Sequence, residues 1–132
     1  MDPAAQLETA QAQLEDSRPA QALRTLKGAF PRELRLEAEF LRAEALRSQG
    51  FFDKAVALYE TVLRGAGADR GLTLEAALGL ASVHRSLGEA RQARARLSQA
   101  RSAAGGADAR VTLEDALIDR VEGRWAVCLR KL

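Results

Sequence analysis

Apolar residues recur three and four positions apart along most of the chain, and glycine or proline interrupts each recurring stretch. This spacing places the apolar side chains on one side of a helix and predicts amphipathic α-helices. The first is predicted to begin at Pro3 after the N-cap Asp2, and the second to be capped by Ser17 with Pro19 in its first turn. Further helices are predicted over about 32–49, 52–64, 72–87, 89–103 and 110–132, with a loop over 65–69.

Sequence motifs recur along the chain at a nearly constant distance. Leu-Glu pairs stand near predicted helix starts at Leu36, Leu74 and Leu113, which are 38 and 39 residues apart. The triplet Gly-Ala-Asp at 67–69 returns at 106–108. A period of this length, with two helices in each unit, predicts a solenoid of stacked helix hairpins.

The composition agrees with a helical protein and argues against other classes. The chain holds 27 alanines and 20 leucines, but only 12 residues of the β-branched types Val, Ile and Thr. This excludes an all-β domain and argues against an α/β one. Since 47% of the residues are hydrophobic, a disordered chain is excluded as well.

The charges are mixed along most of the chain and sum to +2, whereas nucleic-acid binders usually concentrate cations. One local excess exists, five arginines against Glu89 within residues 85–101. The single cysteine, Cys128, cannot form an internal disulfide, and no uncharged apolar stretch approaches the 18 residues of a membrane helix. We therefore expect a soluble cytoplasmic protein.

Residues 43–63 carry a pattern of small and aromatic residues. Ala43 is followed seven positions later by Gly50, then by Phe52, Ala55 and Tyr59. This pattern closely resembles a tetratricopeptide (TPR) repeat. A second copy in the same register consists of Ala81, Gly88, Ala90, Ala93, Leu97 and Ala100, and a weaker first copy of Ala10, Ser17, Pro19, Ala22, Leu26 and Ala29. Small residues let two helices approach closely, and glycine permits a tight reversal.

The resemblance implies an all-α fold of antiparallel helix hairpins stacked into a TPR-like right-handed solenoid. We predict a single domain over residues 1–132, with hairpins at about 3–30, 32–64 and 72–104. Glycine-rich loops stand where a proline often closes such a repeat, which suggests a bacterial-style variant.

The C-terminal stretch allows more than one interpretation. Gly123-Arg124-Trp125 is similar to a TPR turn, with Cys128 in the small-residue position. Helical spacing of apolar residues nevertheless continues through Gly123, and residues 125–132 also match residues 80–87. We predict one long helix over about 110–132.

The resemblance also implies that the first helix of each hairpin lines a concave groove. The groove residues predicted on these helices are Phe40, Glu44, Arg47, Leu78, Ser82, Arg85, Leu117 and Arg120, with Arg130 in place of Arg120 in the other register of the last helix. Arginines in such a groove could bind carboxylates of a partner bidentately. Alternatively, they pair with carboxylates of the chain itself, such as Glu44 or Glu75. The Lys and Asn pair of chaperone-binding TPR domains is absent, so that clamp is not predicted.

The function predicted from these features is a non-catalytic protein-interaction module that binds a peptide or helix of a partner, with Arg47 and Arg85 selecting acidic character. Two alternatives are self-assembly through Trp125 and Leu132, and a regulatory segment that contacts nucleic acid through Arg91, Arg94 and Arg101. No enzyme, metal site or cofactor is predicted. His84 is the only histidine, and no phosphate-binding loop or zinc-ligand spacing occurs.

Overall fold

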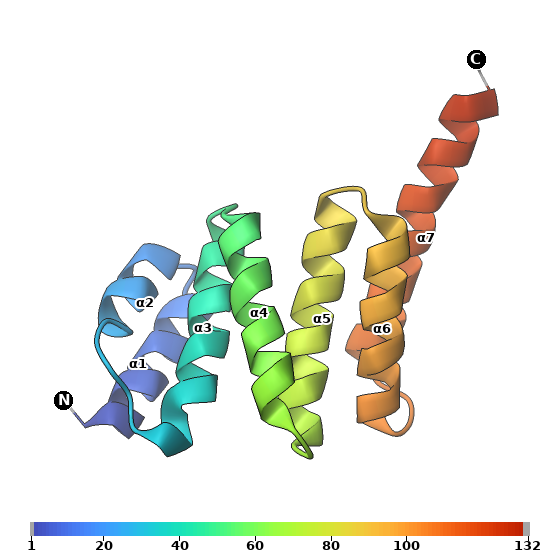
Figure 1. Ribbon diagram of the computed structural model, residues 1–132. Coiled ribbons are helices and arrows are strands. Elements are labelled where there is room, and N and C mark those ends of the chain that lie inside the picture. Colours follow the sequence, from blue (N-terminus) through green and yellow to red (C-terminus); the bar gives the residue numbers. More distant parts are fainter. Residues whose placement is uncertain (1, 131–132) are drawn as a thin grey trace. The chain divides into compact units, whose positions relative to one another are not determined.

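The computed structural model describes the backbone of residues 2–130 and the side chains of residues 2–123. Over these residues the chain forms seven α-helices and one short 3₁₀-helix, without any strand, and Figure 1 shows their order. The elements are α1 (Pro3–Glu15), α2 (Pro19–Thr25), η1 (Arg32–Leu34), α3 (Arg35–Ser48), α4 (Phe52–Ala66), α5 (Arg70–Ser86), α6 (Ala90–Ala104) and α7 (Ala109–Arg130). The prediction of an all-α protein is confirmed.

The helices form two compact units, Met1–Ala68 and Asp69–Leu132. The first contains two helix pairs, α1 with α2 and α3 with α4. The second contains the pair α5 and α6, and α7 packs against both of them. The prediction of one continuous domain over 1–132 stays a prediction.

The core of the first unit lies where α3 meets the first helix pair. It is built from Leu7, Ala10, Ala22, Leu26, Phe30, Ala38, Leu41 and Ala45, all buried. Ala38, Leu41 and Ala45 recur at helical spacing, so one side of α3 covers α1 and α2. Ala43, elsewhere on α3, is fully buried as well, as are Ala55, Tyr59 and Val62 of α4, with which α3 forms its hairpin.

The alanines of the repeat pattern are buried as the sequence predicts. Ala43 and Ala55 in the first unit, and Ala81 and Ala93 in the second, have no exposed surface. An alanine at a helix contact brings the two backbones closer than a larger residue would. The hairpins therefore close in the way that the small-residue pattern predicts.

The same turn joins the two helices of all three hairpins. Its central residue is left-handed, with φ of 59° at Ser17, 84° at Gly50 and 76° at Gly88. The next backbone N–H donates to the carbonyl five residues earlier, over 2.8 Å from Arg18 to Gln13, 2.9 Å from Phe51 to Leu46 and 2.8 Å from Glu89 to His84. This is the Schellman arrangement that closes a helix end.

Ser17 does not cap the second helix, contrary to prediction. It occupies the left-handed turn position, and Arg18 is the residue before the helix that begins at Pro19. The repeat position that Ser17 shares with Gly50 and Gly88 decides its conformation, and the hydroxyl makes no capping hydrogen bond.

Several other boundaries differ from those predicted. Helix α2 ends at Thr25, so Ala29 lies outside it and is exposed. A 3₁₀ turn precedes α3, which begins at Arg35 and not near residue 32. Helix α4 continues through Gly65 to Ala66, because Ala66 is buried and Gly65 lies against the Leu36 side chain, where a Cβ atom would be 2.7 Å from Leu36 Cδ2.

The two matching Gly-Ala-Asp segments precede equivalent helix starts. The Asp69 carboxylate accepts from the Leu72 N–H at 3.0 Å, and the Asp108 carboxylate accepts from the Arg110 N–H at 2.9 Å. Helix α7 then runs unbroken through Gly123, which confirms the single long helix and excludes a turn at that glycine. The side chains of Trp125 and Cys128 lie outside the described residues.

The turn geometry predicts opposite effects for two substitutions. Ser17→Gly should raise the free energy of unfolding by about 0.5–1 kcal/mol, because glycine relieves the left-handed strain of a residue with a Cβ atom. Gly50→Ala should lower it by about 1–2 kcal/mol for the same reason. Urea denaturation measures both.

Gly106→Ala is the matched control, since Gly106 does not have a positive φ and nothing lies within 4 Å of the added Cβ. It should be close to neutral. A loss of stability on Ser17→Gly would contradict the strain argument.

Candidate partner-binding face

The predicted groove residues lie on α3, α5 and α7. On α3 and α5, Arg47 and Arg85 occupy the same repeat position, one turn after Ala43 and Ala81. All eight predicted residues retain some exposure, and Arg120 is exposed. Their polar members, however, make contacts within each unit that decide what they can bind.

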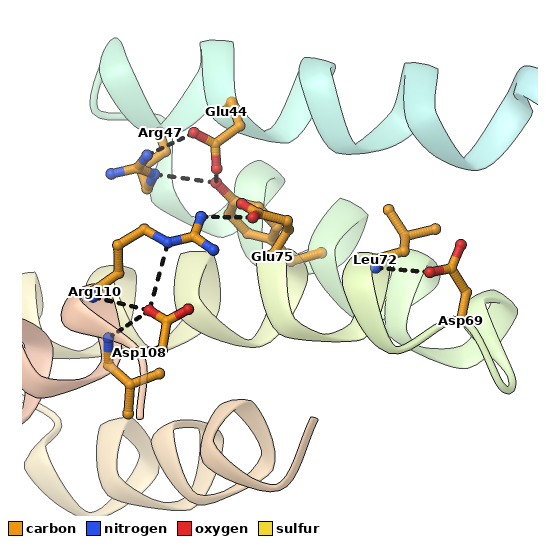
Figure 2. A network of polar contacts seen from close by, with 9 residues as sticks. Glu44, Arg47, Asp69, Leu72, Glu75, Asp108 and Arg110 are labelled. Carbon is orange, nitrogen blue, oxygen red and sulfur yellow. Dashed lines mark hydrogen bonds and ion pairs between the residues drawn. The ribbon is translucent and has the colours of Figure 1, made fainter. Parts of the chain in front are cut away.

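In the first unit, Arg47 binds Glu44 (Figure 2), and Tyr59 completes a closed triad with these two residues. The guanidinium donates to Glu44 Oε2 at 2.7 Å and to the Tyr59 hydroxyl at 3.0 Å. The hydroxyl in turn donates to Glu44 Oε1 at 2.5 Å. Burial, together with the Glu44 charge, raises the pKa of Tyr59, so the phenol keeps its proton and remains a donor.

Phe40 packs beside this triad. Its ring centroid lies 6.0 Å from that of Tyr59, at an interplanar angle of 58°. Phe40 is half-buried and also contacts the core of the first unit. It therefore supports Tyr59 from one side and shows only part of its ring to solvent.

In the second unit, Arg85 is paired with a carboxylate from another helix. Its Nε donates to Glu114 Oε2 at 2.7 Å, and its Nη2 donates to Glu114 Oε1 at 3.2 Å. Nη2 also lies 3.3 Å from the Ser82 hydroxyl oxygen. Glu114, on α7, is only 8% exposed and is the one buried charged residue among those the structure describes.

The difference between the two arginines follows from the residues around them. Ser82 stands at the repeat position of Glu44, and Leu97 at that of Tyr59. Arg85 therefore lacks both polar partners that its own hairpin would provide in the first unit. A half-buried guanidinium without a counter-charge is costly, and Glu114 supplies that charge.

A second ion pair joins α5 and α7 in the reverse sense. Arg110 of α7 donates to Glu75 of α5 at 2.5 Å, and Figure 2 shows Arg110 between Glu75 and Asp108. Desolvation alone would raise the pKa of Asp108. The backbone N–H groups of Arg110 and Val111 and the charge of Arg110 outweigh this effect, so the pKa is lowered. Glu75 and Glu114 are equivalent residues of successive repeats, so each helix supplies one glutamate to the other.

Leucines line α5 and α7 beside these ion pairs. Leu78 and Leu117 are half-buried, and they hold equivalent positions 39 residues apart. Leu113, one turn before Leu117, is 61% exposed and is the most exposed large apolar residue that the structure describes. The face of the second unit thus combines apolar side chains with arginines that are already neutralised.

The sequence did not predict the role of the arginines on α6. Arg94 is surrounded by three carboxylates of α7, with Nη1 3.0 Å from Asp115, Nε 2.5 Å from Glu122, and Nη2 in contact with Asp119. Arg101 is 3.5 Å from Asp115. Two of the three arginines considered for nucleic acid are therefore occupied within the chain. The excess of arginine over 85–101, read together with the carboxylates at 114, 115, 119 and 122, is the signal for this contact.

Other kinds of site find no support in the part of the chain that the structure describes. No group of three or more His, Cys, Asp and Glu residues there could hold a metal ion. His84 Nδ1 lies 3.0 Å from Glu89 Oε1, across the turn between α5 and α6. No helix of the described residues combines the length and the apolar character that a membrane span requires.

The burial of Glu114 predicts unequal effects of removing equivalent glutamates. Glu114→Ala should lower the free energy of unfolding by about 1–3 kcal/mol, because it leaves Arg85 half-buried without its partner. Glu75→Ala should lower it by less than about 0.5 kcal/mol, since that pair is largely exposed. Urea denaturation of the two variants makes the comparison, and equal losses would contradict it.

The raised pKa of Tyr59 predicts how the protein responds to alkali. The unfolded chain ionises its one tyrosine near pH 10, so the burial of the phenol stabilises the fold below that pH, and the stabilisation is lost as the pH rises further. Absorbance at 295 nm should show no tyrosinate until the helices melt, as followed by circular dichroism at the same pH. Ionisation of Tyr59 near pH 10 in the folded protein would contradict the triad.

Comparisons with known proteins agree with the geometry. The family model described as tetratricopeptide repeat matches residues 34–104, which is more than half of the chain. Neither the curated proteins nor the solved structures provide a match. The matched range contains the two hairpins whose alanines are buried and whose turn glycines are left-handed. The chain belongs to the tetratricopeptide repeat family.

Proposed function

We propose that this chain is a non-catalytic interaction module that binds a peptide or helix of a partner protein along the first helices of its hairpins. Tetratricopeptide repeats generally mediate protein–protein interactions. The residues proposed for this binding are Phe40, Glu44 and Arg47 in the first unit, and Leu78, Ser82, Arg85, Leu117 and Arg120 in the second. Membership of the family supports a protein-binding function. The side chains on these helices support the proposed position of the binding surface.

The observation that carries the proposal is the row of leucines on α5 and α7. Leu113 is 61% exposed, and Leu78 and Leu117 are half-buried. The two reciprocal Arg–Glu pairs hold α5 and α7 together, so this surface is formed before a partner arrives. A preformed surface loses little conformational entropy on binding, which favours affinity.

Internal ion pairs make Arg47 and Arg85 less suitable than the leucines as anchors for a partner. Arg47 and Arg85 already bind Glu44 and Glu114, so a partner carboxylate would have to displace an internal one. We therefore assign anchoring to Leu78, Leu113 and Leu117. Arg120, exposed one turn beyond Leu117, then provides the preference for an acidic partner residue.

Affinity capture from a lysate of the source organism tests this assignment. The double variant Leu113→Asp/Leu117→Asp places two charges in the apolar row and should lose the captured partner at least tenfold. Gln92→Asp, an exposed substitution on α6, is the matched control and should retain it. The captured proteins are identified by mass spectrometry. Equal capture by the wild type, the double variant and the control would contradict binding at this face.

A further inference from the structure

Helices α6 and α7 have opposite charges on the sides that meet. Helix α6 contains four arginines and no acidic residue within Ala90–Ala104. The described part of α7, residues 109–123, contains two arginines and four carboxylates, at Glu114, Asp115, Asp119 and Glu122. Such separation of charge between neighbouring helices indicates a contact selected by electrostatic complementarity.

Every one of these four carboxylates meets an arginine of the α5–α6 pair. Asp115, Asp119 and Glu122 are spaced four and three residues apart, so they lie on one side of α7 and converge on Arg94. Asp115 also reaches Arg101, and Glu114 binds Arg85. We use the term basic face for the surface formed by Arg85, Arg94 and Arg101.

Apolar burial contributes less to this contact than to the hairpin beside it. Among its described residues, α7 buries only Val111, Glu114 and Ile118, whereas α5 buries six residues with no charged one among them. The side chains of Arg94, Asp119 and Glu122 are 40%, 66% and 46% exposed. Ion pairs this exposed stabilise weakly and are screened by salt, so the contact of α7 with α6 can be exchanged more readily than the more buried Arg85–Glu114 pair with α5.

The connection to α7 permits such an exchange. Residues 105–108 link it to α6, and they begin with two glycines, the first of them left-handed at φ 68°. A segment that is joined by a short glycine-containing loop and docks through its own surface can dock on a second copy of the same chain with the same contacts.

We infer that the basic face is a docking site for an acidic amphipathic helix supplied in trans, and that its partner is α7 of a second copy of this chain. Complementary charges support α7 as the helix that docks there. Its carboxylates at 114, 115, 119 and 122, together with Val111 and Ile118, already fit the basic face within one chain. In the wild type, the covalent link gives the chain's own α7 an effective concentration on the order of millimolar, so the monomer predominates. This inference does not depend on the binding face proposed above.

A pair of charge-reversal variants tests the inference on the full chain. The first is Arg94→Glu, and the second is Asp119→Arg/Glu122→Arg. In either variant alone, residue 94 meets like charges on the chain's own α7, so the docking of α7 at this point is weakened. In an equimolar mixture each chain can dock the other's α7 with complementary charges. Light scattering coupled to size exclusion should give the monomer mass for each variant and twice that mass for the mixture.

Arg91→Glu is the matched control for the first variant. It makes the same charge change on α6, but Arg91 forms no ion pair with the part of α7 whose side chains the structure describes. Mixed with the double variant, it should remain at the monomer mass. A monomeric mixture with Arg94→Glu would overturn the inference, and so would dimers formed equally well with Arg91→Glu.

If circular dichroism shows that a charge-reversal variant has lost helicity, a cross-linking experiment tests the inference in its place. Arg94→Cys is placed in one chain and Asp119→Cys in another, both carrying Cys128→Ser. Because Arg94 and Asp119 are in contact, α7 exchanged between the chains brings the two thiols together. A disulfide-linked heterodimer on a non-reducing gel supports the exchange, and its absence after mild oxidation overturns it.

Discussion

The close approach of paired helices through fully buried alanines is the constraint on which the rest of this structure depends. The side chain of an alanine is a single methyl group, and those of Ala43 and Ala55, and again of Ala81 and Ala93, are fully buried. Each hairpin therefore closes tightly. That closure sets where the flanking positions point. Arg47 and Arg85 are brought to equivalent places by it, and each then requires a carboxylate within reach.

The two units meet this requirement in different ways, and the difference explains the position of α7. In the first unit the counter-charge comes from the same hairpin, through Glu44 and the phenol of Tyr59. In the second unit serine and leucine have replaced that pair, and Glu114 arrives from the next helix. The buried glutamate thus fixes α7 on α5, while the carboxylates at 115, 119 and 122 orient it toward α6.

Much of the fold could be predicted from the sequence, because its signals are local. The spacing of Ala43, Gly50, Ala55 and Tyr59 and its copy beginning at Ala81 fix two hairpins without reference to distant residues. The candidate site was less predictable, since the state of an arginine depends on what packs against it. Nothing within ten residues of Arg85 shows that Glu114 will bind it, and the partners of Arg94 lie 21 to 28 residues ahead. Only the comparison of charge between two helices would have revealed these contacts.

The turn at Ser17 bears on how repeats of this kind are recognised. The backbone of this turn forms the same hydrogen bonds as the turns at Gly50 and Gly88, although serine carries a side chain and glycine does not. The family model begins at residue 34, after the hairpin that contains this serine. A left-handed serine can therefore complete a hairpin turn of this shape, and a search for the turn glycine alone would miss the hairpin formed by α1 and α2.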